Sequence, residues 1–115
     1  MKYVLLIYQA KDYNPKALSA DEHKAVAARY GVVNKTPNVR PGLPLGFPKD
    51  AITVRVRDAE TVTTHGPYVE RAGSTVGGYY EFEAETDEEA IRLASQIPAA
   101  SQGGAVEIRP SRTYW

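Results

Sequence analysis

The fold is decided by the stretch Lys2-Tyr3-Val4-Leu5-Leu6-Ile7-Tyr8, in which aliphatic and aromatic residues occupy both alternating faces of a strand. A strand with two apolar faces is typical of the interior of a sheet that is covered on both sides. A domain of this size can cover one side of a sheet with its own helices. We therefore expect a second copy of the chain to cover the other side, in a homodimer.

Two capping boxes, each a Ser or Thr followed three residues later by Glu, predict where helices begin. The first box starts at Ser19 and the second at Thr86. The apolar stripes that follow predict helices over residues 19–31 and 87–97, ended by a glycine and a proline. His23 falls on the inward stripe of the first helix, so its side chain should point toward the sheet.

Strand patterns account for most of the remaining chain. Alternating residues at 52–57 and 61–65 flank a short turn and predict a β-hairpin, and residues 75–84 and 105–110 predict two further strands. The segment 34–50 contains four prolines, which suit neither a helix interior nor a central strand. It is predicted to be a long loop, either a lid over a cleft or an irregular segment with an ordered edge strand near residues 43–45.

The order of these elements predicts one domain over residues 1–115, an α+β sandwich of ferredoxin-like type with an inserted β-hairpin. Both helices should cover one sheet face, above Tyr80, Phe82, Val106 and Ile108. The opposite face combines an apolar first strand with polar and charged residues. Such a mixed face suits a partly hydrated cleft at a dimer interface.

Charge and composition narrow the classes of function. The chain has 14 basic and 14 acidic residues among 115, so its formal net charge is zero, and no basic run indicates nucleic-acid or membrane-surface binding. The absence of Cys excludes disulfides and thiolate sites, and two His residues are too few for a His-rich metal cage, so no metal or cofactor is expected. The longest apolar run, residues 4–7, is far too short to span a bilayer, and no secretory signal is recognisable, so a cytoplasmic location is expected.

Five blocks of the sequence carry a resemblance to a known family: residues 2–8, 53–58, 65–70, 77–80 and 97–110. Taken in order, these blocks resemble the YCII-related proteins and specifically their DGPF-domain branch. The resemblance implies a ferredoxin-like, dimeric α+β barrel, similar to muconolactone isomerase, with a cleft between the helices and the sheet near the dimer interface. The branch's Asp-Gly-Pro-Phe signature is His65-Gly66-Pro67-Tyr68 here, so an imidazole stands at the acidic position.

The two histidines are the candidate catalytic residues. His65 ends a predicted strand just before a Gly-Pro turn, where it could act as a general acid or base, because imidazole titrates near neutral pH. The alternative for His65 is a hydrogen bond that only caps the turn. The resemblance implies a cleft His on the first helix, which His23 matches by position, although a half-buried structural His is the commoner situation. If both imidazoles face one pocket, their repulsion would separate their titrations and give one base and one acid.

The candidate substrate-binding residues are Tyr79, Arg55 and Arg109. Either arginine could hold a substrate carboxylate in a bidentate manner, and Tyr79 could donate to a developing enolate oxygen. The sequence thus favours a cofactor-independent enzyme that isomerises or eliminates a small cyclic or aromatic acid by proton transfer. The alternative is a non-catalytic module that binds a ligand or a protein.

Overall fold

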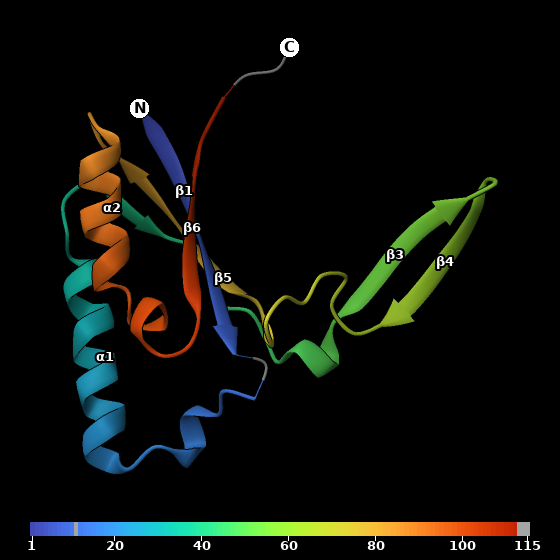
Figure 1. Cartoon of the computed structure of the whole chain (residues 1–115), viewed down its shortest axis with the longest axis horizontal. Helices are drawn as coiled ribbons and strands as arrows, with labels where there is room; N and C mark the ends of the chain where they lie inside the picture. The colour runs from blue at the N-terminus through green and yellow to red at the C-terminus, as the bar shows by residue number, and fades with distance from the viewer. Residues whose placement is uncertain (11, 113–115) are drawn as a thin grey trace.

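The computed structural model describes residues 1–10 and 12–112, and strand β1 (Lys2–Ala10) lies in the middle of its main sheet (Figure 1). Strands β5 (Ser74–Glu83) and β6 (Ala105–Pro110) pair with β1 on either side, both antiparallel. The short strand β2 (Val39–Pro41) pairs with the other edge of β5 and completes the order β2-β5-β1-β6. The predicted central position of the first strand is confirmed.

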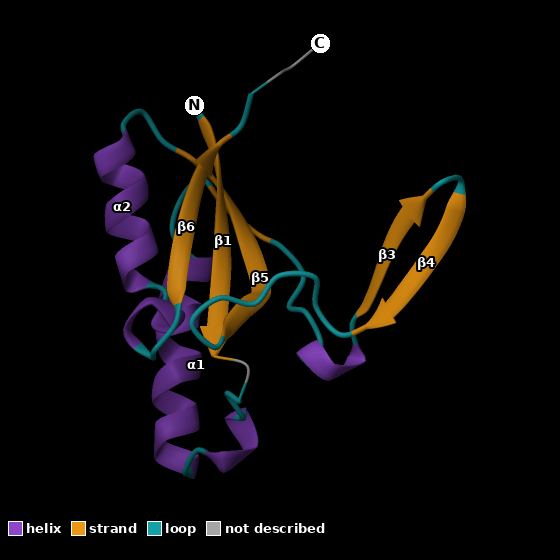
Figure 2. Ribbon diagram, turned by 45° about the vertical axis from the view of Figure 1, so that its right-hand side comes forward, coloured by secondary structure: helices purple, strands orange, loops and turns teal. Residues whose placement is uncertain are grey.

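Helices α1 (Ala20–Asn34) and α2 (Asp87–Gln96) cover the same face of this sheet (Figure 2). The capping box at Ser19 is present in full, because the Ser19 side chain accepts from the Glu22 N–H and the Glu22 carboxylate accepts from the Ser19 N–H. The predicted stop at Gly31 is wrong, since α1 continues to Asn34. A glycine inside a helix costs about 1 kcal/mol, and the burial of Val33 beyond it offsets that cost.

The hydrophobic core lies between the helices and one face of the sheet. Tyr80 and Phe82 are buried there as predicted, and Val106 and Ile108 are partly buried and pack against the core cluster. Helix α1 adds only Val33 to the fully buried set, so the N-terminal part of this helix is the less tightly packed part. The remaining core residues come from β1, α2 and the segments that follow β5 and α2; they are Tyr3, Leu5, Ile7, Ala84, Ala90, Leu93, Ile97 and Ala99.

The opposite face of the sheet has no helix over it among the described residues. The β1 side chains on this face, Val4, Leu6 and Tyr8, are half-buried, whereas those facing the helices are buried or nearly so. Pairing across β5 and β6 places Glu81 and Arg109 beside Val4. The mixed polar and apolar character that the sequence predicts for this face is therefore present.

The predicted β-hairpin consists of β3 (Ile52–Arg57) and β4 (Glu60–His65), which form a separate two-stranded sheet. Asp58 and Ala59 form its turn with φ angles of 49° and 65°, the left-handed values that a two-residue hairpin turn of type I′ requires. Figures 1 and 2 show the hairpin extending away from the main sheet, and almost all of its residues are exposed.

The proline-rich segment follows the edge of the main sheet. Its strand is β2, at residues 39–41, so the ordered strand lies a few residues before the predicted position. After Pro41 the chain stays beside β5, since the Gly42 N–H donates to the Tyr79 carbonyl at 2.9 Å and the Leu45 N–H donates to the Gly77 carbonyl at 3.0 Å. We call residues 41–45 the strap.

Among the described residues there are also three short 3₁₀ turns: η1 (Pro15–Ala17) before α1, η2 (Pro48–Asp50) before the hairpin and η3 (Pro98–Ser101) before β6. The described part of the chain is thus an α+β fold with a mostly antiparallel four-stranded sheet and a two-stranded hairpin. None of the described helices is both long and apolar enough to cross a membrane.

Candidate functional site

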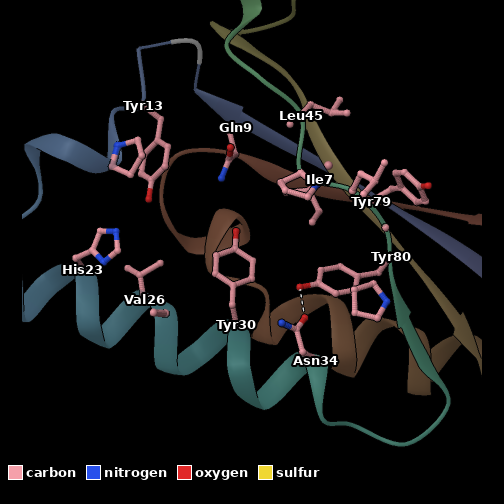
Figure 3. Close-up of a pocket in the computed structure, with 18 of the residues that line it drawn as sticks. Ile7, Gln9, Tyr13, His23, Val26, Tyr30, Asn34, Leu45, Tyr79 and Tyr80 are labelled. Atoms are coloured by element: carbon pink, nitrogen blue, oxygen red, sulfur yellow. Dashed lines mark hydrogen bonds between the residues drawn. The ribbon is translucent and has the colours of Figure 1, made fainter.

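A pocket of about 450 Å³ lies between α1 and the sheet, and Figure 3 shows its main residues. One wall is the face of α1 between His23 and Asn34, and the opposite wall comes from β1, β5 and the loop that follows β1. The strap closes one side. The full lining is Ile7, Gln9, Tyr13, Pro15, Leu18, His23, Val26, Ala27, Tyr30, Asn34, Pro41, Gly42, Leu43, Pro44, Leu45, Gly77, Gly78, Tyr79 and Tyr80.

The α1 wall is a single helical stripe. His23, Val26, Tyr30 and Asn34 follow one another at spacings of three or four residues, which places them on one face of the helix. At a rise of 1.5 Å per residue, His23 and Tyr30 are separated by about 10 Å along the helix axis. The exposed imidazole therefore stands near one end of the pocket and the Tyr30 phenol near its middle (Figure 3).

The sheet wall contains a β-bulge that makes room for a polar side chain. The pairing of β1 with β5 shifts register between Ile7 and Tyr8, so Gly77 has no direct partner on β1. A Cβ at Gly77 would lie 2.7 Å from the Gln9 side-chain oxygen. The glycine thus leaves space for the Gln9 amide, which points into the pocket from the wall opposite Tyr30 (Figure 3).

Three phenols meet in the pocket, from Tyr13, Tyr30 and Tyr80. Burial raises the pKa of Tyr30, and the neighbouring Tyr13 raises it further, while hydrogen bonding by the Gln9 side chain and the Ala99 backbone acts in the opposite direction. Burial, together with the nearby Tyr30, also raises the pKa of Tyr80. Both phenols consequently stay protonated and remain hydrogen-bond donors at neutral pH.

One of these donors already has a partner within the chain. The Tyr80 hydroxyl donates to the side-chain oxygen of Asn34 at 2.7 Å, and this bond ties β5 to the last turn of α1 (Figure 3). The bond fixes the floor of the pocket beside the buried core.

The described lining contains no Lys, Arg, Asp or Glu, and His23 is its one side chain of a type that titrates near neutral pH. Within residues 1–10 and 12–112, no group of three or more His, Cys, Asp or Glu is arranged to hold a metal ion. The pocket is therefore an apolar cavity with a few neutral polar groups and a single imidazole, a composition typical of sites for small organic molecules.

Two of the five predicted site residues line this pocket. His23 does so, in the direction that its helical stripe predicts. Tyr79 borders the pocket with its backbone beside the strap, but its ring points away from the cavity, packed where a Cβ on Gly42 would overlap it (Figure 3).

The other three predicted residues lie elsewhere. His65 is exposed at the end of β4, where it pairs with Ile52, so in the described chain the two histidines do not share a pocket. Arg55 lies on the hairpin with its guanidinium 5.6 Å from the Tyr68 ring, and Arg109 forms an ion pair of 3.0 Å with Glu107 on the open sheet face. Their roles toward a substrate stay predictions.

Sequence reasoning missed most of the polar lining, namely Gln9, Tyr13, Tyr30, Asn34 and Tyr80. A signal did exist for two of them, because Tyr30 and Asn34 follow His23 by seven and eleven residues on the same stripe. Gln9 and Tyr13 carry no such signal, since the sheet brings them to the pocket from the opposite side.

Comparison of the sequence with models of known protein families and with curated proteins gave no match.

Proposed function

We propose that this pocket binds a small cyclic or aromatic metabolite and that His23 exchanges a proton with it. The observation that carries the proposal is the position of one imidazole at the end of an apolar cavity of about 450 Å³ whose other described polar groups are neutral. A cavity of this volume and lining suits one or two rings.

His23 can act in both directions during such a reaction. A neutral imidazole accepts a proton from a carbon of the ligand, and the resulting imidazolium returns it to a neighbouring carbon in an isomerisation or to a leaving group in an elimination. The apolar walls strengthen the hydrogen bonds that hold the intermediate, because a ligand seated against them displaces water from its contacts. His23 itself is exposed on the helix, so it can re-equilibrate with solvent between turnovers.

The test compares a variant at His23 with a matched control variant at His65. Cyclic ketones, lactones and small aromatic acids are first screened for thermal stabilisation of the wild type. For an enolisable hit, exchange of the α-hydrogen with solvent deuterium is then followed by NMR. We expect His23→Gln to lower the exchange rate at least a hundredfold and His65→Gln, the matched control, to leave it within twofold. Equal loss in both variants, or none in His23→Gln, would remove His23 from the proposed role.

A non-catalytic ligand-binding function is the second candidate, and a specific observation favours it. No carboxylate in the described lining is available to orient the His23 ring or to stabilise its protonated form. If the screen finds ligands that stabilise the protein but undergo no deuterium exchange, binding without chemistry is the function.

We also propose that the chain works as a homodimer of ferredoxin-like domains, in the manner of the YCII-related proteins of the DGPF branch and in the cytoplasm. The strand order β2-β5-β1-β6 supports the domain type. The uncovered sheet face and the hairpin support the dimer. On one hairpin face, Ile52, Val54 and Val56 are 64%, 59% and 68% exposed. An isolated hairpin is only marginally stable in water, so a partner surface that covers these side chains would stabilise it.

A stable dimer interface needs both uncovered surfaces, the hairpin face and the open face of the main sheet. One face of the hairpin supplies about 200 Å² and one face of the main sheet about 400–500 Å², judged from strand rise and spacing. Together they approach the roughly 800 Å² per partner of a stable interface, which neither reaches alone. Sedimentation equilibrium of the wild type should give a dimer, and Leu6→Lys on the open sheet face should give monomers; a monomeric wild type at 100 µM would refute the proposal.

A further inference from the structure

We infer that the pocket selects an uncharged cyclic or aromatic molecule that presents a carbonyl or phenolic oxygen, and that the Tyr30 hydroxyl is the donor that binds this oxygen. The inference rests on the proposed ligand-binding function and goes beyond it by naming the chemical class of the ligand and the residue that recognises it.

The charge of the lining argues against a carboxylate or phosphate ligand. An anion that enters an apolar cavity loses its hydration and needs a cation or several strong donors in return. No Lys or Arg belongs to the described lining, and both Arg55 and Arg109 are engaged elsewhere, with Tyr68 and Glu107. The imidazole of His23 is exposed at one end of the cavity rather than enclosed by it. A neutral ring therefore fits the lining better than an anionic one.

Hydrogen bonding and position distinguish the phenol of Tyr30 from that of Tyr80. Tyr80 already donates its hydroxyl to Asn34, so this pair is satisfied without a ligand. Tyr30 is half-buried near the middle of the pocket, and its hydroxyl points from α1 into the cavity, toward the sheet wall that carries Gln9 (Figure 3). A protonated phenol in this position can donate its O–H to an oxygen of a ligand that enters the cavity.

The spacing along α1 sets the size of the ligand. His23 and Tyr30 are about 10 Å apart along the helix axis, and the small side chains of Val26 and Ala27 lie between them. A ring system placed over these two residues can offer its oxygen to Tyr30 at one end and a carbon–hydrogen bond to His23 at the other. The raised pKa of Tyr30 is consistent with a phenol that acts as a donor throughout the neutral range.

Calorimetric titration with two probes of the same ring system tests this inference. The probes are 2-naphthol, which is uncharged at pH 7, and 2-naphthoate, which is an anion. We expect the wild type to bind 2-naphthol at least tenfold more tightly than 2-naphthoate. Tyr30→Phe should weaken 2-naphthol about fivefold, the usual effect of losing one hydrogen bond between neutral groups, and should leave 2-naphthoate unchanged.

Two further variants control the experiment. Tyr68→Phe makes the same chemical change outside the pocket and should alter neither affinity. Ala27→Trp fills the cavity from α1 and should abolish binding of 2-naphthol while circular dichroism shows the fold intact. The inference fails, and the proposed pocket stands, if 2-naphthoate binds as tightly as 2-naphthol or if Tyr30→Phe binds both probes like the wild type. The inference about Tyr30 and the proposed ligand-binding pocket are both refuted if neither probe binds the wild type or if Ala27→Trp still binds 2-naphthol.

Discussion

Substitution to Ala at Gly77 and at Gly104 should have different effects on the free energy of unfolding: little change at Gly77 and a large loss at Gly104. The comparison tests the geometry of the pocket wall beside Gly77. The atoms nearest to a Cβ at Gly77 belong to the flexible Gln9 side chain, whose oxygen would lie at 2.7 Å. A Cβ at Gly104 would overlap the Tyr8 carbonyl oxygen and approach the Ala99 carbonyl oxygen at 3.0 Å, and both of these are backbone atoms. Neither glycine has a positive φ, so space decides the result.

The magnitudes follow from what each neighbour can do. Gln9 can rotate away, so the strain in Gly77→Ala is small. It is comparable to the roughly 0.4–1 kcal/mol by which Ala stabilises a protein relative to Gly, because Ala lowers the conformational entropy of the unfolded chain. The net change in unfolding free energy should stay within about 1 kcal/mol. At Gly104→Ala the backbone of β1 and η3 must move, which costs about 3 kcal/mol.

Urea unfolding and probe binding together separate the two effects. Gly104→Ala should lower the midpoint by about 1–2 M urea, whereas the midpoint of Gly77→Ala should move by less than about 0.7 M. Despite its normal stability, Gly77→Ala should weaken the binding of 2-naphthol about threefold to fivefold, because the displaced Gln9 amide no longer offers its polar group on the pocket wall. The reasoning is refuted if Gly77→Ala unfolds as easily as Gly104→Ala, or if it is stable and binds 2-naphthol like the wild type.

Three further outcomes are expected. Alkaline titration followed at 295 nm should show that some of the eight tyrosines ionise above the ordinary pKa of 10.0, because burial raises the pKa of Tyr30 and Tyr80 and a hydrogen bond to Asp87 raises the pKa of Tyr3. The contribution of these protonated phenols to the free energy of unfolding is complete below pH 10 and is lost as the pH rises through their raised pKa values. Unfolding curves measured at alkaline pH would show this loss. Ser19→Ala should cost about 1 kcal/mol and speed hydrogen exchange in the first turn of α1, and unchanged exchange there would contradict the role of the capping box. A double-mutant cycle between Tyr80→Phe and Asn34→Ala should give a coupling of about 1 kcal/mol, and a coupling near zero would show that their bond does not contribute.

Much of the fold could be predicted because its signals are local. Helix starts are set by side-chain caps, and the hairpin by strict alternation around a two-residue turn. Strand β2 could not be placed, since a three-residue edge strand that pairs on one side carries no periodic pattern. The end of α1 was also out of reach, because Gly31 permits a stop and only the tertiary burial of Val33 carries the helix past it.

The candidate site was harder to predict because three separate features create it. The stripe of α1 that faces the sheet carries His23 and Asn34 where a structural helix would carry large apolar residues, and Val33 is the one residue of α1 that is fully buried. The strap cannot form a helix that would fill the resulting space, because its prolines and its hydrogen bonds to β5 keep it extended. The bulge at Gly77 then turns Gln9 into that space.

Each of these features violates a rule that favours a tightly packed core, and all three violations face one cavity. Polar residues on a core-facing stripe, extended proline-rich backbone beside a sheet and a glycine at a strand interior each lower stability on their own. Departures from local consistency of this kind are expected where binding, rather than packing, determines the residue. Their convergence on the space between His23 and Tyr30, and not on the hairpin that carries His65, is the physical reason for placing the function in this pocket.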